Sequence, residues 1–132
     1  MLTFEVSVLK IWKQPLLFCA GGAGYVGLEF LWRGWSHASM FLAGGSCFLL
    51  LGQLQKKAGK WPLLLRALAG AAVVTAVELV TGLIANRNYS VWDYRALPLN
   101  LMGQVCLLYS FLWMPVSLAA MAIYRQIDRR MR

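Results

Sequence analysis

The sequence predicts an all-α integral membrane protein, a bundle of four transmembrane helices in one domain over residues 1–132, on three observations. Sixty per cent of the 132 residues are apolar and only 14% are charged. The mean hydropathy is +0.60, far above that of an ordinary soluble domain. Four nearly uncharged stretches follow one another, and each is close to the ~20 residues that a helix needs to cross the hydrocarbon core.

The four spans are expected at about residues 15–32, 38–54, 62–85 and 97–124. The second lies at the short limit for a crossing. In the fourth, Pro115 interrupts the helical hydrogen bonds and predicts a kink. Each half contains a glutamate, an aromatic-rich outer loop, a glycine and a cysteine in the same order. This order is compatible with two tandem helical hairpins related by an axis along the membrane normal.

Basic residues predict the orientation. Ten of them lie before the first span, between the second and third or just inside the third, or in the tail, against three in the other two loops. Because basic residues concentrate in cytoplasmic loops, we expect a multi-pass protein of the cell membrane with both termini in the cytoplasm. The charges flank spans and lack interleaved exposed aromatics, so no nucleic-acid partner is expected. The ten are Lys10, Lys13, Lys56, Lys57, Lys60, Arg66, Arg125, Arg129, Arg130 and Arg132; the three are Arg33, Arg87 and Arg95.

Residues Gly22–Gly27 match the G-x-G-x-x-G fingerprint of dinucleotide-binding proteins. That motif requires a strand-to-helix turn and an acidic residue about 20 positions later. Here it lies inside an apolar span, and Phe41–Gly45 contains no acid. We therefore expect no nucleotide cofactor. Small residues on this face, including Gly24 and Gly27, instead predict close helix packing and a homo-oligomer.

The three cysteines fall inside expected spans and lack the spacing of metal ligands. We expect them to be buried free thiols, with neither a disulfide nor a metal site. No set of residues identifies a catalytic nucleophile.

Two glutamates inside apolar runs are the most informative residues. A carboxyl group at membrane depth costs roughly 2.5 to 3.5 kcal/mol on insertion scales and is tolerated when it faces a partner, a cavity or a proton path. From the end of the first span onward, Glu29, Arg33 and His37 recur every four residues, so they form one ladder if the helix extends that far. A glutamate four residues before an arginine is the order that favours an ion pair between the two. A structural salt bridge and a place in a substrate or ion path both remain open.

In the third span a stripe of small and polar residues predicts that Glu78 points into the bundle. Asn100 and Gln104 are four residues apart in the expected fourth helix. Their amides are suited to hydrogen bonds between helices and equally to contact with a ligand. The stripe consists of Ala71, Thr75, Glu78 and Gly82.

The loop between the third and fourth spans contains an aromatic–acid–aromatic run. Trp92 and Tyr94 fit the aromatic belt at a membrane interface, and Asp93 and Arg95 are suited to pairing or to capping the next helix. We interpret these four residues, with His37, as the candidate outer mouth of a cavity.

Several of these motifs together resemble the CmpB-like family of ABC-transporter type IV permeases. The second half carries them in Glu78–Gly82, Trp92–Tyr94, Pro98, Asn100, Gly103 and a helix with Trp113, over roughly Thr75–Ser117. In the first half, Gly24–Gly34 is similar to the glutamate and arginine-glycine elements of the family. The Gly-Pro and Pro-x-Tyr-Gly elements expected next are replaced by Trp35–Gly45.

The resemblance implies a transport-related role. The sequence has no P-loop of the G-x-x-x-x-G-K-[ST] type, so a motor for ATP-driven transport would be a separate ATPase or other membrane subunit. The leading hypothesis is a small transporter or channel-type protein. The alternatives are an accessory or assembly protein without transport activity and, third, a membrane enzyme acting on lipid-linked substrates. The proposed path is lined by Glu29, Arg33, Glu78, Asn100 and Gln104.

Overall fold

The computed structural model describes residues 2–130, with side chains from Trp12 onward. Arg132 and the side chain of Lys10, both counted toward the orientation, lie outside the described residues. The chain forms four helices and one short hairpin, so the predicted all-α class is confirmed. The elements in order are α1 (Leu2–Arg33), α2 (Ala38–Ala58), α3 (Leu63–Ala85), β1 (Asn100–Leu101), β2 (Val105–Cys106) and α4 (Leu107–Arg130).

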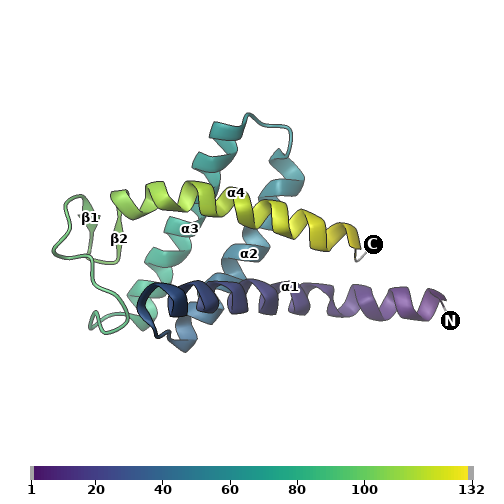
Figure 1. The fold of residues 1–132 in the computed structure, drawn as a ribbon, viewed down its shortest axis with the longest axis horizontal. Coiled ribbons are helices and arrows are strands. Elements are labelled where there is room, and N and C mark those ends of the chain that lie inside the picture. Colours follow the sequence, from purple (N-terminus) through teal and green to yellow (C-terminus); the bar gives the residue numbers. More distant parts are fainter. Residues whose placement is uncertain (1, 131–132) are drawn as a thin grey trace.

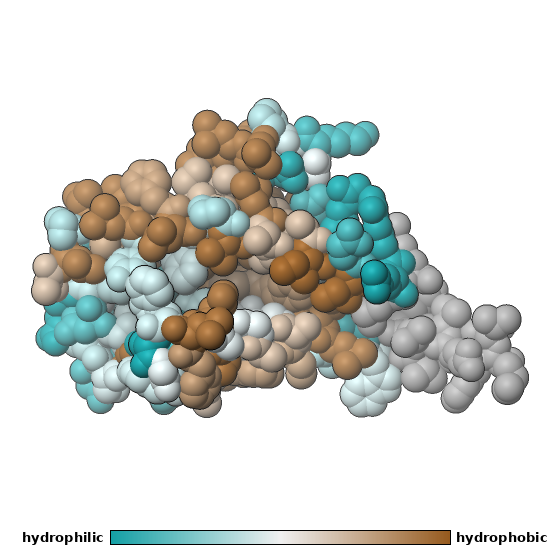
Figure 2. Space-filling view, viewed as in Figure 1, coloured by the Kyte–Doolittle hydropathy of each residue, from teal (hydrophilic) through white to brown (hydrophobic). Residues whose placement is uncertain are grey.

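All four helices are long and apolar enough to cross a membrane, over Trp12–Arg33, Ala38–Ala58, Leu63–Ala85 and Leu107–Arg130. Large apolar side chains on them face outward, among them Leu31, which is 87% exposed. They form the brown areas of the surface in Figure 2. Such a surface is costly in water and favourable in lipid.

In Figure 1, α1 and α4 run along the length of the molecule, and α2 and α3 run across them. The described parts of the two chain ends lie at one end of the molecule, and the loop with β1 and β2 lies at the other. The helices α1 and α2 approach closely through glycines: a Cβ on Gly22 would meet the Phe41 ring at 2.9 Å, and one on Gly21 the Gly44 carbonyl oxygen at 3.0 Å. The absence of side chains at these glycines is what permits the close contact of α1 and α2.

The glycines predicted to pack the first helix are not the ones that touch α2. A Cβ added to Gly24 or Gly27 would meet nothing within 4 Å. Within the described chain these two positions are open, because they lie on the side of α1 that faces away from the bundle. Gly22–Gly27 is helical throughout, so the fingerprint is not a phosphate-binding loop.

The core lies where α1, α2 and α4 meet at the end near the termini. Leu17, Phe48 and Tyr124 form one buried cluster, with the rings of Phe48 and Tyr124 edge to face at 5.4 Å. Lys13 of α1 forms an ion pair with Asp128 of α4 nearby. A second cluster around Leu51, Val74 and Met121 joins α2, α3 and α4. These contacts hold the bundle together below the outer loop.

The prediction that the fourth helix begins near residue 97 was wrong. It begins at Leu107, and the preceding residues form the β1–β2 hairpin. Leu99, Met102 and Gly103 have positive φ angles, which a right-handed helix excludes. The Asn100 side chain donates to the carbonyl of Leu97 at 2.8 Å and accepts from the Gly103 N–H at 3.0 Å, and these bonds replace helical ones. Hydropathy does not separate this apolar hairpin from a helix.

Candidate functional site

A cavity of about 650 Å³ lies among the helices at the end of the bundle that carries the loop between α3 and α4. All four helices contribute side chains to it, and both intramembrane glutamates line it. Figure 2 shows that the face carrying α1 and α4 is hollowed between these helices. The size is in the range of sites that bind small organic molecules.

Glu29 enters the cavity with a cationic partner. The Nε atom of Arg33 lies 2.6 Å from Glu29 Oε2, so the ion pair that the spacing predicts is present. Arg33 Nη1 also donates to the carbonyl oxygen of Val91 at 2.6 Å, and its guanidinium lies 3.9 Å from the centre of the Trp35 ring. The charge of Glu29 is thus balanced, and Arg33 ties α1 to the outer loop.

His37 does not extend this ladder, because α1 ends at Arg33 and Gly34 follows with φ +77°. It is instead the N-cap of α2, where its Nδ1 accepts from the Ser39 N–H at 3.1 Å. The expected row of three residues is therefore a row of two, and His37 does not line the cavity.

Glu78 lies in the second half of α3 and is 9% exposed. As the stripe predicts, it points into the bundle, where the Trp113 indole Nε1 donates to its Oε2 at 2.9 Å. The other oxygen, Oε1, is buried and makes no hydrogen bond of regular geometry to the described part of the chain. The described ion pairs do not include Glu78. One turn away, Thr75 and Ser110 share a hydrogen bond of 2.8 Å that joins α3 to α4.

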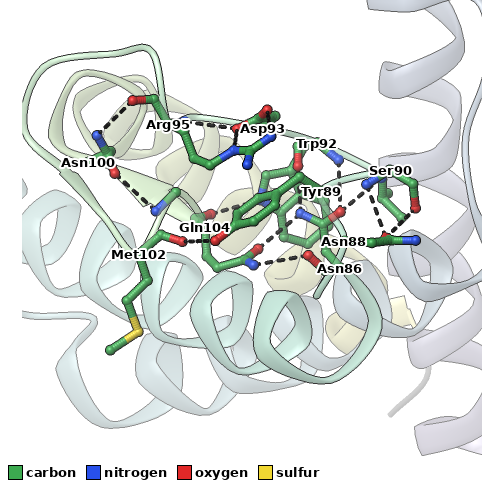
Figure 3. Close-up of polar contacts among 12 residues, drawn as sticks. Asn86, Asn88, Tyr89, Ser90, Trp92, Asp93, Arg95, Asn100, Met102 and Gln104 are labelled. Atoms are coloured by element: carbon green, nitrogen blue, oxygen red, sulfur yellow. Dashed lines mark hydrogen bonds and ion pairs between the residues drawn. The ribbon is translucent and has the colours of Figure 1, made fainter.

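The loop above the cavity is organised by Asn86, which is 0% exposed. Its Nδ2 donates to the Trp92 carbonyl at 2.6 Å and to Gln104 Oε1 at 2.9 Å. Its Oδ1 accepts from the backbone N–H groups of Val91 and Trp92 at 2.8 and 3.2 Å. Gln104 Nε2 returns a bond of 3.0 Å to the Asn86 carbonyl, so the two amides hold each other as drawn in Figure 3.

Asn100 and Gln104, predicted as neighbours on the fourth helix, belong to this loop instead. Asn100 is in β1 and Gln104 is in the turn before β2. Neither lines the cavity. Their side chains are occupied by the backbone and by Asn86. The sequence contained a signal for this turn in Pro98 and Gly103, which disfavour a helix.

The predicted outer mouth divides in two. Trp92, Asp93 and Tyr94 line the cavity, whereas Arg95 does not. Trp92 is buried rather than placed in an interfacial belt, and its Nε1 donates to the Gln104 carbonyl at 2.8 Å. Arg95 lies over the Tyr89 ring at 4.0 Å and pairs with Asp93 at 2.8 Å. The predicted pairing of these two residues is therefore present.

Two groups of the mouth have shifted pKa values. Hydrogen bonds from Arg95 lower the pKa of Asp93 to about 2, so this carboxyl group is ionised at neutral pH. Burial, and next the charge of the nearby Glu78 carboxylate, raise the pKa of Tyr94 well above its usual range. Tyr94 is thus a neutral hydroxyl beside Glu78.

Aromatic side chains of α1 and α4 are the feature that sequence reasoning missed. Tyr94 stacks on Tyr109 with ring centres 4.9 Å apart, and Tyr25 lies 6.0 Å from Trp113. All four line the cavity. Tyr25 stands one helical turn before Glu29, and Tyr109 one turn before Trp113, a spacing that would have placed them on the lining faces.

One family comparison bears on this site. Residues 16–131 match the model of the family described as "Putative ABC-transporter type IV". The chain belongs to this family. The predicted resemblance is confirmed over nearly the whole length. The match includes the first half, where Trp35–Gly45 replaces the Gly-Pro and Pro-x-Tyr-Gly elements expected of the family. No curated protein and no solved structure matches the chain. Family membership and four apolar helices make it a transporter-like, multi-pass membrane protein.

Proposed function

We propose that this family member is a small transporter or channel-type protein of the cell membrane whose path passes through the cavity between Glu29 and Glu78. The observation that carries the proposal is that one cavity of about 650 Å³ reaches both carboxyl groups. Two acidic side chains at membrane depth are costly, and a shared cavity gives them a common use. Glu29, Arg33 and Glu78 form the path, and Asn100 and Gln104 support the loop above it.

The proposed path needs access from the two membrane faces in turn. Native cysteines provide the reporters, because Cys47 lines the cavity whereas Cys19 is exposed on the outer side of α1. Chains that retain one of these cysteines would be treated with a charged, membrane-impermeant thiol reagent in right-side-out and inside-out vesicles. We expect Cys47 to react from both sides and Cys19, in lipid, from neither.

A second reporter guards against slow reaction of a buried thiol. Ala43→Cys, in a chain without native cysteines, places a thiol at another lining position of α2. If neither Cys47 nor Ala43→Cys reacts from either side, the cavity is not a path, and the accessory role becomes the better interpretation. Reaction from a single side for both reporters would also contradict transport.

The proposed orientation has both termini in the cytoplasm. It is supported by the excess of basic residues and by the position of both described chain ends at one end of the molecule (Figure 1). Cysteines at Lys57 and Arg130 are expected to react from the cytoplasmic side only, and one at Asn88 only from outside. Labelling of positions 57 and 88 from the same side would contradict the topology.

We also propose partners. The sequence contains no P-loop, and the family description names an ABC-transporter type, so a separate ATPase or membrane subunit would supply the motor for active transport. A homo-oligomer is proposed because Gly24 and Gly27 are open on the outer side of α1.

An accessory or assembly protein is the second candidate. The observation that favours it is that many polar side chains already bond to one another. Arg33 pairs with Glu29, and Asn86 and Gln104 hydrogen-bond to each other. A protein that only stabilises a larger complex would have just such bonds. Glu78, with one oxygen that makes no hydrogen bond of regular geometry to the described chain, is the residue that this candidate leaves without a use.

A further inference from the structure

Aromatic side chains are prominent in the lining of the cavity. Six rings from α1, α4 and the loop between α3 and α4 line it together with the two glutamates. Their faces carry partial negative charge and attract cations, most strongly when water is excluded. The remaining lining is largely aliphatic, which is unsuited to a hydrated inorganic ion. The rings belong to Tyr25, Trp32, Trp92, Tyr94, Tyr109 and Trp113.

The polar edges of two of these tryptophans, Trp92 and Trp113, are already occupied. The Trp113 N–H is used by Glu78 and the Trp92 N–H by the Gln104 carbonyl. What these two rings can offer a ligand is therefore their faces, not hydrogen-bond donors. Aromatic faces beside carboxylates are the combination that recognises an organic cation.

The balance of charge in the cavity points the same way. Its charged lining is Glu29, Arg33, Glu78 and Asp93. Arg33 is paired with Glu29 and donates from Nη1 to the Val91 carbonyl, so its positive charge is balanced within the lining, although its Nη2 atom makes no hydrogen bond to the described chain. The charge of Asp93 is paired with Arg95. Glu78 alone among these acids lacks a basic partner in the described chain, and a cation in the cavity would supply one.

The cavity is also bordered by side chains on the lipid-facing surface. Leu28 and Trp32 of α1 and Leu112 and Val116 of α4 line it while being 36–78% exposed. The opening between α1 and α4 is therefore apolar. A ligand entering there would need an apolar body to partition into the bilayer as well as a positive charge.

From these observations we infer that the cavity binds amphipathic organic cations, such as aryl- or alkyl-substituted ammonium compounds. The positive centre lies beside Glu78 among the faces of Tyr94, Tyr109 and Trp113, and the apolar body lies against the aliphatic lining. This inference rests on the proposed function and names its substrate class.

The test compares two molecules of nearly equal shape and different charge. Methyltriphenylphosphonium is a cation, and triphenylphosphine oxide is neutral, with oxygen in place of the methyl group. Binding of each to the full chain in lipid nanodiscs would be measured by calorimetry, with empty nanodiscs as the blank. We expect the cation to bind about tenfold or more tightly than the oxide.

Three variants sharpen the comparison. Glu78→Gln retains an acceptor for the Trp113 N–H and is expected to remove the preference for the cation while leaving binding of the oxide unchanged. Tyr109→Leu is expected to weaken binding of the cation by several-fold. Asp128→Asn makes the same acid-to-amide change in a buried residue at the other end of the bundle and is the matched control, expected to bind like the wild type. Thermal unfolding checks that each variant is folded.

Equal affinity for the two molecules, or binding of neither, overturns the inference without using any variant. A cation preference that survives in folded Glu78→Gln overturns it as well. The proposed function is judged separately by thiol access. If Cys47 reacts from both sides and the cation is not preferred, the proposed path is supported and the proposed substrate class is wrong. Preference for the cation in a cavity closed to thiol reagents supports a binding site and removes the path.

Discussion

Glu78 and Asn86 lie eight residues apart at the inner face and the end of α3, and both are at most 9% exposed. Asn86 uses both atoms of its amide and its backbone carbonyl in hydrogen bonds within the loop. Glu78 has one hydrogen bond of regular geometry, from Trp113, and its other oxygen makes no such bond to the described chain, although the Tyr94 hydroxyl lies beside it. The two residues are similarly buried. The side-chain atoms of Asn86 are all hydrogen-bonded, whereas one carboxyl oxygen of Glu78 makes no hydrogen bond of regular geometry.

The difference separates a structural polar group from one available to a ligand. Buried polar groups in folded proteins are nearly always hydrogen-bonded, so a saturated network stabilises one conformation, and an unsaturated group needs its own explanation. Asn86 fixes the outer loop over the cavity. Glu78 offers the cavity an acceptor at membrane depth, where a missing partner is most costly.

The largest expected effect comes from removing the side chain of Asn86, the residue whose amide is fully hydrogen-bonded. Asn86→Ala removes an amide and leaves two backbone N–H groups, the Trp92 carbonyl and the side-chain oxygen of Gln104 without their partner. We expect a loss of about 3 kcal/mol or more in the free energy of unfolding, because each buried group left unpaired costs roughly 1–3 kcal/mol. Denaturant unfolding in detergent would measure it. A loss below 1 kcal/mol would show that the network is not structural.

A smaller loss is expected when the same network is crowded. A Cβ on Gly82 would lie 2.9 Å from Gln104 Cδ and 3.0 Å from the Trp92 ring, neither of which is free to move. Gly82→Ala should cost about 1–3 kcal/mol by overpacking. The matched control is Gly27→Ala, which meets nothing within 4 Å and should be stabilising by roughly 0.5–1 kcal/mol through helix propensity. Equal effects of the two changes would contradict the packing argument.

The two glutamates are expected to separate stability from activity. Glu29→Gln breaks the ion pair with Arg33, which is partly exposed, and should cost about 1 kcal/mol. Glu78→Gln keeps the bond from Trp113 and should change stability by less than about 1 kcal/mol. Uptake of an amphipathic organic cation into proteoliposomes, by contrast, should fall most in Glu78→Gln. Normal uptake in Glu78→Gln would remove this residue from the proposed path.

The open glycines should affect association and leave the fold of the chain unchanged. Gly24→Leu with Gly27→Leu adds bulk where the described chain has no neighbour, so unfolding of the separate subunit should change little. Close approach of a second copy would be blocked, and crosslinking in lipid should fall several-fold. A wild-type protein that is monomeric at every accessible concentration would rule out this interface.

The smallest expected effect concerns pH and the mouth. The pKa of Asp93, lowered to about 2 from its ordinary 3.8, means that its pairing with Arg95 favours the fold above the ordinary value and is lost as the pH falls toward 2. Between pH 5 and 8, wild type and Asp93→Asn should therefore show the same pH dependence of thermal unfolding. A difference that changes within this interval would mean that Asp93 is not held by Arg95.

Much of the fold could be predicted from sequence, because a bilayer imposes its length and hydropathy on every span. The first three helices were placed to within a few residues at most ends, and the ion pair of Glu29 with Arg33 and the inward direction of Glu78 followed from helical spacing. The start of α4 did not, since apolar residues 97–106 satisfy a hydropathy window whether helical or folded as a hairpin.

The site was only half predictable. Glu29, Arg33, Glu78, Trp92, Asp93 and Tyr94 are brought together in one cavity, whereas Asn100, Gln104, His37 and Arg95 are outside its lining. The unpredicted neighbours of Glu78 are aromatic residues of α1 and α4. In a membrane protein, aromatic residues inside spans give no signal of their own, because lipid contact, helix packing and ligand contact all accept them.

By itself the sequence determined the number of spans and the presence of two glutamates at membrane depth, because hydropathy and helical period are local properties of the chain. Only the tertiary structure decided that Asn86 would be saturated and Glu78 would not. Saturation depends on which groups from distant segments arrive within bonding distance: Gln104 is 18 residues from Asn86, and Trp113 is 35 from Glu78. Such separations leave no local pattern, so the difference between a structural amide and an available carboxyl group appears only in the folded chain.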